Sequence, residues 1–223
     1  DSRFSIHPYP PDLKDLYMLY KIITLNNRCN ILEYGSGWSS IILYAGLTHN
    51  KSRLKGKTYP RCLDPYHLEI VDDNKKYLNI SKKRFFKFFK NSPNVKFNFC
   101  KAAMTEFNGK YCVYYQKHPL VNPDLIYLDG PDQFSIKNKI NGFTVSKKEF
   151  MPMSCDILKY EHFLTPGTII VVDGRMANVR FIRSNLQRKW SYYYYKDIEM
   201  SIFSLDEEPL GKLNLMQLDF YKL

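Results

Sequence analysis

The chain has 223 residues, of which 44% are hydrophobic and 25% are charged. At roughly 150 residues per domain, this length fits one full-size domain, and the composition excludes a wholly disordered chain. No apolar run approaches the roughly 18 residues that a membrane-spanning helix needs. We therefore expect a single domain over residues 1–223 and no membrane span.

The chain is strongly basic, with 33 basic and 22 acidic residues and a formal net charge of +11. A basic surface favours polyanionic partners. A coding bias toward Lys, Asn, Ile, Phe and Tyr explains the same composition without any binding role. Both explanations stay open at this point.

The cysteines are odd in number and scattered, with no CxxC motif and no Cys/His cluster. This spacing argues against a disulfide framework and a structural zinc site, and it favours a reducing compartment such as the cytoplasm. The chain begins at Asp1 rather than at Met, so we expect a piece of a longer protein, and a removed targeting segment is compatible with the sequence. The five positions are Cys29, Cys62, Cys100, Cys112 and Cys155.

In chain order, residues 1–27 predict an N-terminal helical lead-in, with a rigid proline-rich segment over 7–11 followed by an amphipathic helix. A buried strand over 30–34 and a helix over 39–47 come next. Residues 48–67 are polar, basic and proline-containing, which predicts an inserted surface loop.

The rest of the chain alternates between short apolar runs and amphipathic stretches. Continuous apolar strands that alternate with helices are typical of a parallel sheet covered on both faces. The expected fold class is therefore α/β, a doubly wound, mostly parallel, Rossmann-like sheet. We predict strands over 69–72, 95–100, 125–128 and 168–172, helices over 75–90, 155–164 and 176–190, and closing antiparallel strands over 192–195, 201–205 and 213–221.

Acidic residues stand at the ends of four of the predicted strands. Ligands of doubly wound sheets bind at the carboxyl ends of the strands. We therefore expect these four segments to converge on one ligand site. They are Glu33-Tyr34-Gly35-Ser36-Gly37, Asp72-Asp73, Asp129-Gly130-Pro131-Asp132 and Asp173-Gly174-Arg175.

The glycine segment is the most informative of the four. Gly35 and Gly37 permit a tight turn and a close backbone approach, and the following helix offers free N–H groups. A dinucleotide site would have a third glycine where this chain has Ser40, and Glu33 suits a cationic ligand better than a pyrophosphate, so a dehydrogenase is disfavoured. Trp38, in the same loop, either shapes the pocket or packs in the core.

These segments resemble the motifs of class I S-adenosylmethionine-dependent methyltransferases. Residues 31–37 are similar to the first motif, an acid followed by G-x-G, and residues 70–72 are similar to the second, whose acid holds the ribose hydroxyls. Residues 124–130 and 164–173 resemble the motifs of the fourth and fifth strands. The resemblance covers residues 28–205. It implies a seven-stranded sheet with the last strand antiparallel, and S-adenosylmethionine as the methyl donor.

The resemblance also implies a cofactor site at the first strand ends. Glu33 and Asp72 are 39 residues apart, against about 20 in a compact unit, because the loop over 48–67 intervenes, and Asp73 is an alternative to Asp72 in the ribose role. The implied cofactor-binding residues are Glu33, Gly35, Ser36, Gly37, Trp38, Asp72, Asp73 and Asp129.

The acceptor site is expected between 129–132 and 173–175. Asp129 or Asp132 would take the proton of the acceptor beside Asp173, and Arg175 would hold an anionic group, or else pair with Asp173 or Asp129 and stiffen the pocket. Gly174-Arg175 stands where metal-dependent relatives carry a metal ligand. No metal is therefore expected, although Asp129, Asp132 and Asp173 offer oxygen ligands.

The expected function is methyl transfer from S-adenosylmethionine to a small polar, anionic or glycan-type acceptor. Two alternatives stay open. One is a non-catalytic Rossmann-like binding domain of a larger glycan-handling protein, and the other is an RNA methyltransferase, suggested by the charge of +11. The sequence has no N-P-P-Y-type motif for a flipped base and no added RNA-binding module, so nucleic acid is the less favoured partner.

Overall fold

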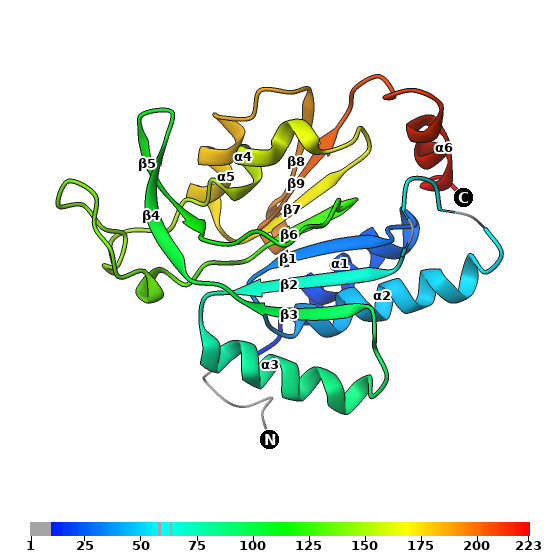
Figure 1. Ribbon diagram of the computed structural model, residues 1–223, viewed down its shortest axis with the longest axis horizontal. Helices are drawn as coiled ribbons and strands as arrows, with labels where there is room; N and C mark the ends of the chain where they lie inside the picture. The colour runs from blue at the N-terminus through cyan, green and yellow to red at the C-terminus, as the bar shows by residue number, and fades with distance from the viewer. Residues whose placement is uncertain (1–9, 58, 63) are drawn as a thin grey trace.

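The protein is built around a seven-stranded sheet, seen here in a computed structural model that describes residues 10–57, 59–62 and 64–223 (Figure 1). Of the lead-in predicted over 1–27, residues 1–9 lie outside these ranges, and they include the first three residues of the proline-rich segment over 7–11. The strand order is β3-β2-β1-β6-β7-β9-β8. The strands are β1 (Asn30–Tyr34), β2 (His67–Asp72), β3 (Val95–Phe99), β6 (Leu125–Leu128), β7 (Ile169–Asp173), β8 (Trp190–Tyr195) and β9 (Met200–Leu205).

Only β9 runs against its neighbours. It pairs antiparallel with β7 and β8, whereas β3, β2, β1, β6 and β7 pair in parallel. A mostly parallel seven-stranded sheet with this order and one antiparallel strand is the fold of class I methyltransferases. The predicted fold class is confirmed.

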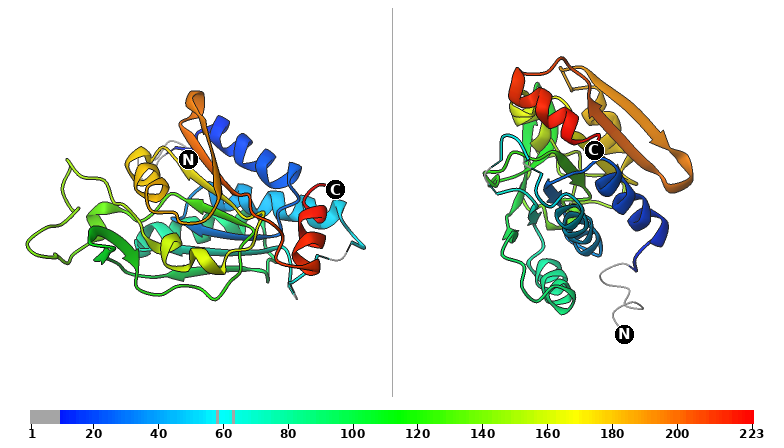
Figure 2. Two further views of the ribbon diagram at one scale, coloured as in Figure 1. Left: turned by 90° about the horizontal axis from the view of Figure 1, so that it is seen from above. Right: turned by 90° about the vertical axis from the view of Figure 1, so that its right-hand side faces the viewer.

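Helices cover both faces of the sheet (Figures 1 and 2). One face carries α1 (Leu13–Leu25), α2 (Ser39–Arg53) and α3 (Lys75–Phe88), and the other carries α4 (Asp156–Tyr160) and α5 (Met176–Arg183). Within the described ranges, no helix has both the length and the apolar character that crossing a membrane requires.

Burial and capping explain why these elements form where they do. Every residue of β1 and β6 is buried, because helices pack against both faces of the sheet. The Asp12 side chain caps α1 by accepting from the backbone N–H groups of Lys14 and Asp15, and Asn74 caps α3 in the same way. The apolar strands and amphipathic helices are thus in place as predicted.

Three predicted boundaries need correction. The helix predicted over 39–47 continues to Arg53, so the basic loop predicted over 48–67 begins later. The helix predicted over 155–164 is α4 followed by a 3-10 turn at Glu161–Phe163. The helix predicted to reach residue 190 ends at Arg183, where Ser184 closes its last turn and leaves the tyrosine-rich run to form β8.

One element is of the wrong type. Residues 213–221 are not a strand: all but Tyr221, the C-cap, lie in α6 (Lys212–Phe220), which begins after Gly211. The apolar alternation misleads here because Leu213 and Leu215 are exposed. Two of its three buried side chains are polar, the third being Phe220: the Asn214 amide donates to the carbonyl of Pro166 at 3.1 Å, and the Gln217 amide donates to the hydroxyl of Tyr59 at 2.8 Å.

A β-hairpin stands where no element was predicted. β4 (Ala102–Phe107) and β5 (Lys110–Tyr115) pair antiparallel within the connection between β3 and β6, which in a doubly wound sheet usually contains a helix. Asn108 and Gly109 form the turn, both with positive φ. The hairpin projects beyond the carboxyl ends of the strands (Figure 1), and its last residue, Tyr115, returns to that edge.

Candidate functional site

The four acidic strand ends meet at one edge of the sheet, as predicted. Their strands β2, β1, β6 and β7 are consecutive neighbours and parallel. The ladder continues into the loops, because the N–H of Gly35 donates to the carbonyl of Val71 at 2.8 Å and the N–H of Asp129 donates to that of Tyr34 at 2.8 Å. The edge therefore brings the glycine segment, Asp72-Asp73, Asp129 and Asp173 together.

The two glycines of the first segment have different surroundings. Gly35 has φ +96°, and a Cβ there would lie 2.9 Å from the carbonyl carbon of Asp129 and 3.0 Å from the N atom of Gly130. Gly35 is thus needed for the packing of the β1 loop against the β6 loop. A Cβ at Gly37 would meet nothing closer than the Ser39 hydroxyl at 3.6 Å, so the open side of the loop is at Gly37.

Glu33 is fully buried and held by the first turn of α2. Its two carboxyl oxygens accept hydrogen bonds from the hydroxyls of Ser39 at 2.5 Å and Ser40 at 2.6 Å. Burial raises the pKa of Glu33 to about 8, so the side chain is mostly protonated at neutral pH. With both oxygens paired and little charge, Glu33 braces the loop, and no described contact directs it toward a cationic ligand.

The two acids after β2 also differ. Both carboxylate oxygens of Asp72 accept hydrogen bonds within the protein: Oδ2 accepts from the Ser36 hydroxyl, and Oδ1 accepts from the N–H of Asn74 at 2.7 Å. Asp73 accepts only the N–H of Asp132, through Oδ1 at 3.1 Å, and its buried Oδ2 has no partner among the described residues. Burial raises the pKa of Asp73 to about 7 and that of Asp72 to about 6.

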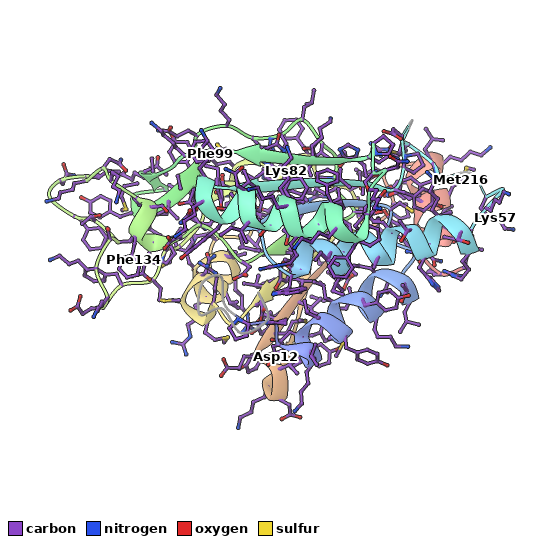
Figure 3. The ribbon with its side chains drawn as sticks, turned by 90° about the horizontal axis from the view of Figure 1, so that it is seen from below. Asp12, Lys57, Lys82, Phe99, Phe134 and Met216 are labelled. Atoms are coloured by element: carbon purple, nitrogen blue, oxygen red, sulfur yellow. The ribbon has the colours of Figure 1, made fainter. Side chains whose placement is uncertain are left out.

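Asp73 lines the larger cavity at this edge, which has a volume of about 730 Å³. The cavity extends from the end of β2 to the end of β3 and is closed by the loop over 132–138. Phe99 and Phe134 are exposed aromatic side chains on its wall, at the same end of the molecule (Figure 3). The basic side chains of its wall are Lys75, Lys76, Lys101 and Lys137.

Trp38 packs between helices. The Arg84 guanidinium of α3 stacks over its indole ring at 4.2 Å, and the ring lies against the apolar cluster of α1, α2 and α3. Of the two alternatives for Trp38, this placement favours core packing. Arg84 itself is buried, and within the described ranges its guanidinium has no hydrogen-bond partner.

Arg175 is bound to the loop after β6. Its Nε donates to Asp129 Oδ1 at 3.3 Å, and its terminal nitrogens donate to the backbone carbonyls of Asp129 at 2.5 Å and Pro131 at 3.1 Å. Of the two alternatives for Arg175, these contacts favour the one in which it pairs with Asp129 and stiffens the pocket, because most of its N–H groups donate within the protein. Asp132 also has local donors, because it caps a short 3-10 turn at Gln133–Ser135 through the N–H of Phe134.

Asp173 lines a second cleft of about 380 Å³ at the end of β7. Its Oδ2 accepts from the Tyr127 hydroxyl at 2.9 Å, and burial raises its pKa to about 6. The cleft is mainly acidic although the chain is basic: two carboxylates from the β8–β9 turn and two from the N-cap and first turn of α1 lie around Asp173, and Lys14 is the basic residue on its wall. These four carboxylates are Asp12, Asp15, Asp197 and Glu199.

In the part of the chain that the structure describes, no group of three His, Cys, Asp or Glu side chains is arranged to hold a metal ion. At this edge, the contacts of Asp129 and Asp132 explain why no such group forms. The first is paired with Arg175, and the second caps its own turn. The oxygen site considered for Asp129, Asp132 and Asp173 does not assemble.

Two tyrosines of the site were not foreseen. Tyr127 projects from β6 and bonds Asp173, and Tyr115 reaches the edge from the unpredicted hairpin. Tyr127 precedes Asp129 by two residues in the predicted strand over 125–128, so its place near the edge could be predicted from that strand. Tyr115 could not be placed at the edge, because the hairpin that carries it was not predicted.

The sequence matches no family model and no curated protein. Among solved structures, the chain is similar to an O-methyltransferase from Bacillus cereus in complex with SAH, at 14% identity and a TM-score of 0.49 over 90% of this chain and 84% of that one. It is also similar to the O-methyltransferase TomG from Streptomyces achromogenes in complex with SAM, at 12% identity and a TM-score of 0.49 over 92% and 85%. Human methyltransferase-like protein 13 in complex with SAH gives 11% identity and a TM-score of 0.41 over 93% and 87%.

Proposed function

We propose that the protein is an S-adenosylmethionine-dependent methyltransferase that acts on a small polar acceptor. The observation that carries this proposal is the unpaired, buried Oδ2 of Asp73 beside the 730 Å³ cavity at the ends of β2 and β3. A buried carboxylate oxygen without a donor is costly, so its position calls for a hydroxyl-bearing ligand. A ribose is such a ligand, and the sequence motif at this strand end points to the same group.

The other features of the edge fit the rest of the cofactor. Phe99 and Phe134 offer aromatic faces to a purine. The open side of the loop at Gly37 and the free N–H groups at the start of α2 suit a polar chain with a terminal carboxylate. When bound, S-adenosylmethionine supplies an activated methyl group. The residues of the chain then have to position the acceptor and remove its proton.

Asp173 is the best-placed base. It lines the second cleft, and only its Oδ2 is engaged by a described residue. With a pKa of about 6, it is mostly ionised near neutral pH and still basic enough to take a proton in hydrogen-bonded contact. Asp129 and Asp132 remain candidates from the sequence. Asp129, however, is paired with Arg175, and Asp132 caps the 3-10 turn at Gln133–Ser135.

The charge of the second cleft limits which chemical classes of acceptor can bind there. Its five carboxyl side chains outnumber the one lysine of its wall, Lys14, so the cleft repels an anion, and Arg175 is already paired with Asp129. We therefore replace the expected anionic acceptor by a neutral polar or amine-bearing molecule whose nucleophile is a hydroxyl or an amine. Methyl transfer needs mainly alignment and a deprotonated nucleophile, which Asp173 can provide.

Calorimetry with S-adenosylhomocysteine tests the proposal. We expect the wild type to bind S-adenosylhomocysteine and not NAD⁺. Asp73→Asn should weaken binding by about 10- to 100-fold through the loss of a charge-assisted hydrogen bond. Asp132→Asn is the matched control, since Asp132 lines the same cavity but its oxygens have local donors, and its affinity should stay close to wild type. Binding of NAD⁺ in place of S-adenosylhomocysteine would overturn the proposal.

A further inference from the structure

The two outer strands of the central sheet are protected to different degrees. In the described part of the chain, β3 pairs only with β2, and β8 pairs only with β9. An outer strand presents unpaired backbone N–H and C=O groups, which proteins guard with charged residues, proline or bulges. β3 has such a guard, because the Lys96 side chain is 62% exposed and pairs with Glu69 of β2.

β8 carries none of these guards. Its six residues, Trp190–Tyr195, include no charged residue and no proline, and its pairing with β9 runs through all six positions without a bulge. Tyr193 is 54% exposed, Tyr194 40% and Tyr195 44%. The β8–β9 hairpin lies at the outer side of the molecule (Figure 2), where a strand of a second molecule can reach it. β8 is therefore an open, tyrosine-rich edge of the sheet.

The sequence of β8 is complementary to itself about Tyr193. Antiparallel pairing of two copies of one strand has two-fold symmetry, so positions equally far before and after the centre oppose each other. With Tyr193 at the centre, Tyr192 of each copy stands opposite Tyr194 of the other. Aromatic cross-strand pairs of this kind stabilise an antiparallel sheet.

The residues that flank β8 carry opposite charges at matching positions. Lys189 and Asp197 lie four residues before and four residues after Tyr193, so each copy places its lysine opposite the aspartate of the other. Asp197 belongs to the 3-10 turn that follows β8, at the end of the ladder. Both residues are exposed, and none of the ion pairs between described residues involves either of them. This charge complementarity favours a second copy of the chain over an unrelated strand as the occupant of the edge.

We propose that the protein forms a two-fold symmetric dimer in which β8 pairs antiparallel with β8 of a second copy, so that the two seven-stranded sheets become one continuous sheet. The pairing uses up the open edge of both copies, so the assembly closes at two chains. Asp197 also lines the second cleft, and the dimer therefore brings Lys189 of the second copy to the rim of that cleft. The dimer goes beyond the proposed function and does not depend on it.

Sedimentation velocity measurements test the assembly, and we expect a species of twice the 26.5 kDa chain mass. Tyr193→Lys places two like charges opposite each other at the two-fold axis and should raise the dimer dissociation constant about 10-fold or more. Phe88→Lys is the matched control. Phe88 is a 60% exposed aromatic residue of α3, at the other end of the sheet, and the change should leave the constant within about 2-fold.

A charge exchange tests the register. Lys189→Glu and Asp197→Lys each bring like charges together at both ends of the ladder and should raise the dissociation constant roughly 3- to 10-fold. The double variant restores the pairs and should return the constant to within about 2-fold of wild type. A wild type that stays monomeric up to about 100 μM, equal effects of Tyr193→Lys and Phe88→Lys, assembly beyond two chains, or no recovery in the double variant would overturn the proposal. Each of these outcomes leaves the proposed function intact.

Discussion

Replacing Gly35 by alanine should destabilise the protein, because the position lacks both conformational and steric freedom. Its φ of +96° is a region that residues with a Cβ rarely adopt, at a cost of about 1–3 kcal/mol. The added carbon would also lie 2.9–3.0 Å from three backbone atoms of Asp129 and Gly130, which no side-chain rotation can relieve. Overpacking of this kind costs about 1–3 kcal/mol. We expect a loss of about 2–6 kcal/mol in the free energy of unfolding.

Gly37→Ala is the matched control two residues away. Its new carbon would meet only the Ser39 hydroxyl at an ordinary contact distance of 3.6 Å, and its φ lies outside the positive region. We expect a change in the free energy of unfolding of under about 1 kcal/mol. If the cofactor approaches the backbone at this open side, Gly37→Ala weakens S-adenosylhomocysteine binding without loss of stability.

Urea denaturation followed by tryptophan fluorescence measures both free energies, provided that the m-value stays constant across the three proteins. Equal destabilisation by Gly35→Ala and Gly37→Ala would refute the division of roles. So would a loss below about 1 kcal/mol for Gly35→Ala. The same reasoning excludes Gly35→Val as a probe of ligand binding, since its folding defect would hide any effect on the ligand.

Four further predictions concern Asp73, Arg175 and the thiols. Because burial raises the pKa of Asp73 to about 7, its contribution to stability is present below about pH 4 and is lost as the pH rises through about 7, so urea titrations should show a flatter pH dependence in Asp73→Asn. A sugar hydroxyl that donates to Asp73 favours its ionised form, so S-adenosylhomocysteine affinity should increase between about pH 6 and pH 8 in wild type only, and calorimetry in two buffers should detect proton release. Arg175→Ala should lower the thermal midpoint by a few degrees, since it removes the bonds to Asp129 and Pro131, and an unchanged midpoint would speak against the stiffening role. A thiol reagent should find about one reactive cysteine, Cys62, in the native protein, because Cys29, Cys100, Cys112 and Cys155 are buried, and five in denaturant; a denatured count of three would contradict the absence of a disulfide.

The arrangement of the acidic edge was predictable because it depends on strand direction alone. Five short apolar runs separated by crossover segments must lie parallel, and parallel strands bring their carboxyl ends to one edge. Glu33, Asp72, Asp129 and Asp173 each lie at the end of such a run, so their convergence required no knowledge of side-chain contacts.

Elements whose buried face is polar or whose pairing is local were not predicted. α6 turns Asn214 and Gln217 inward and leaves Leu213 and Leu215 exposed, which reverses the pattern that sequence periodicity relies on. The β4–β5 hairpin did carry a signal, since Asn108-Gly109 is a strong turn dipeptide between β-forming runs. No element was nevertheless predicted between the strands over 95–100 and 125–128.

The roles of the acids at the edge are decided by how many of their oxygens the protein already satisfies, which residue type does not reveal. Glu33 is bonded by Ser39 and Ser40, Asp72 by Ser36 and Asn74, and Asp129 by Arg175. These donors lie in the loop after β1 and at the starts of α2, α3 and α5, and their positions depend on how those segments pack at the edge, so no spacing rule anticipates them. Asp73, Asp129 and Asp173 each keep an oxygen to which no described residue donates, but Asp129 is half exposed and paired with Arg175, whereas Asp73 and Asp173 each line a cavity. The division into a cofactor side at Asp73 and an acceptor side at Asp173 therefore rests on unsatisfied hydrogen-bonding capacity, and measuring which ligand groups fill it is the direct way to identify the reaction.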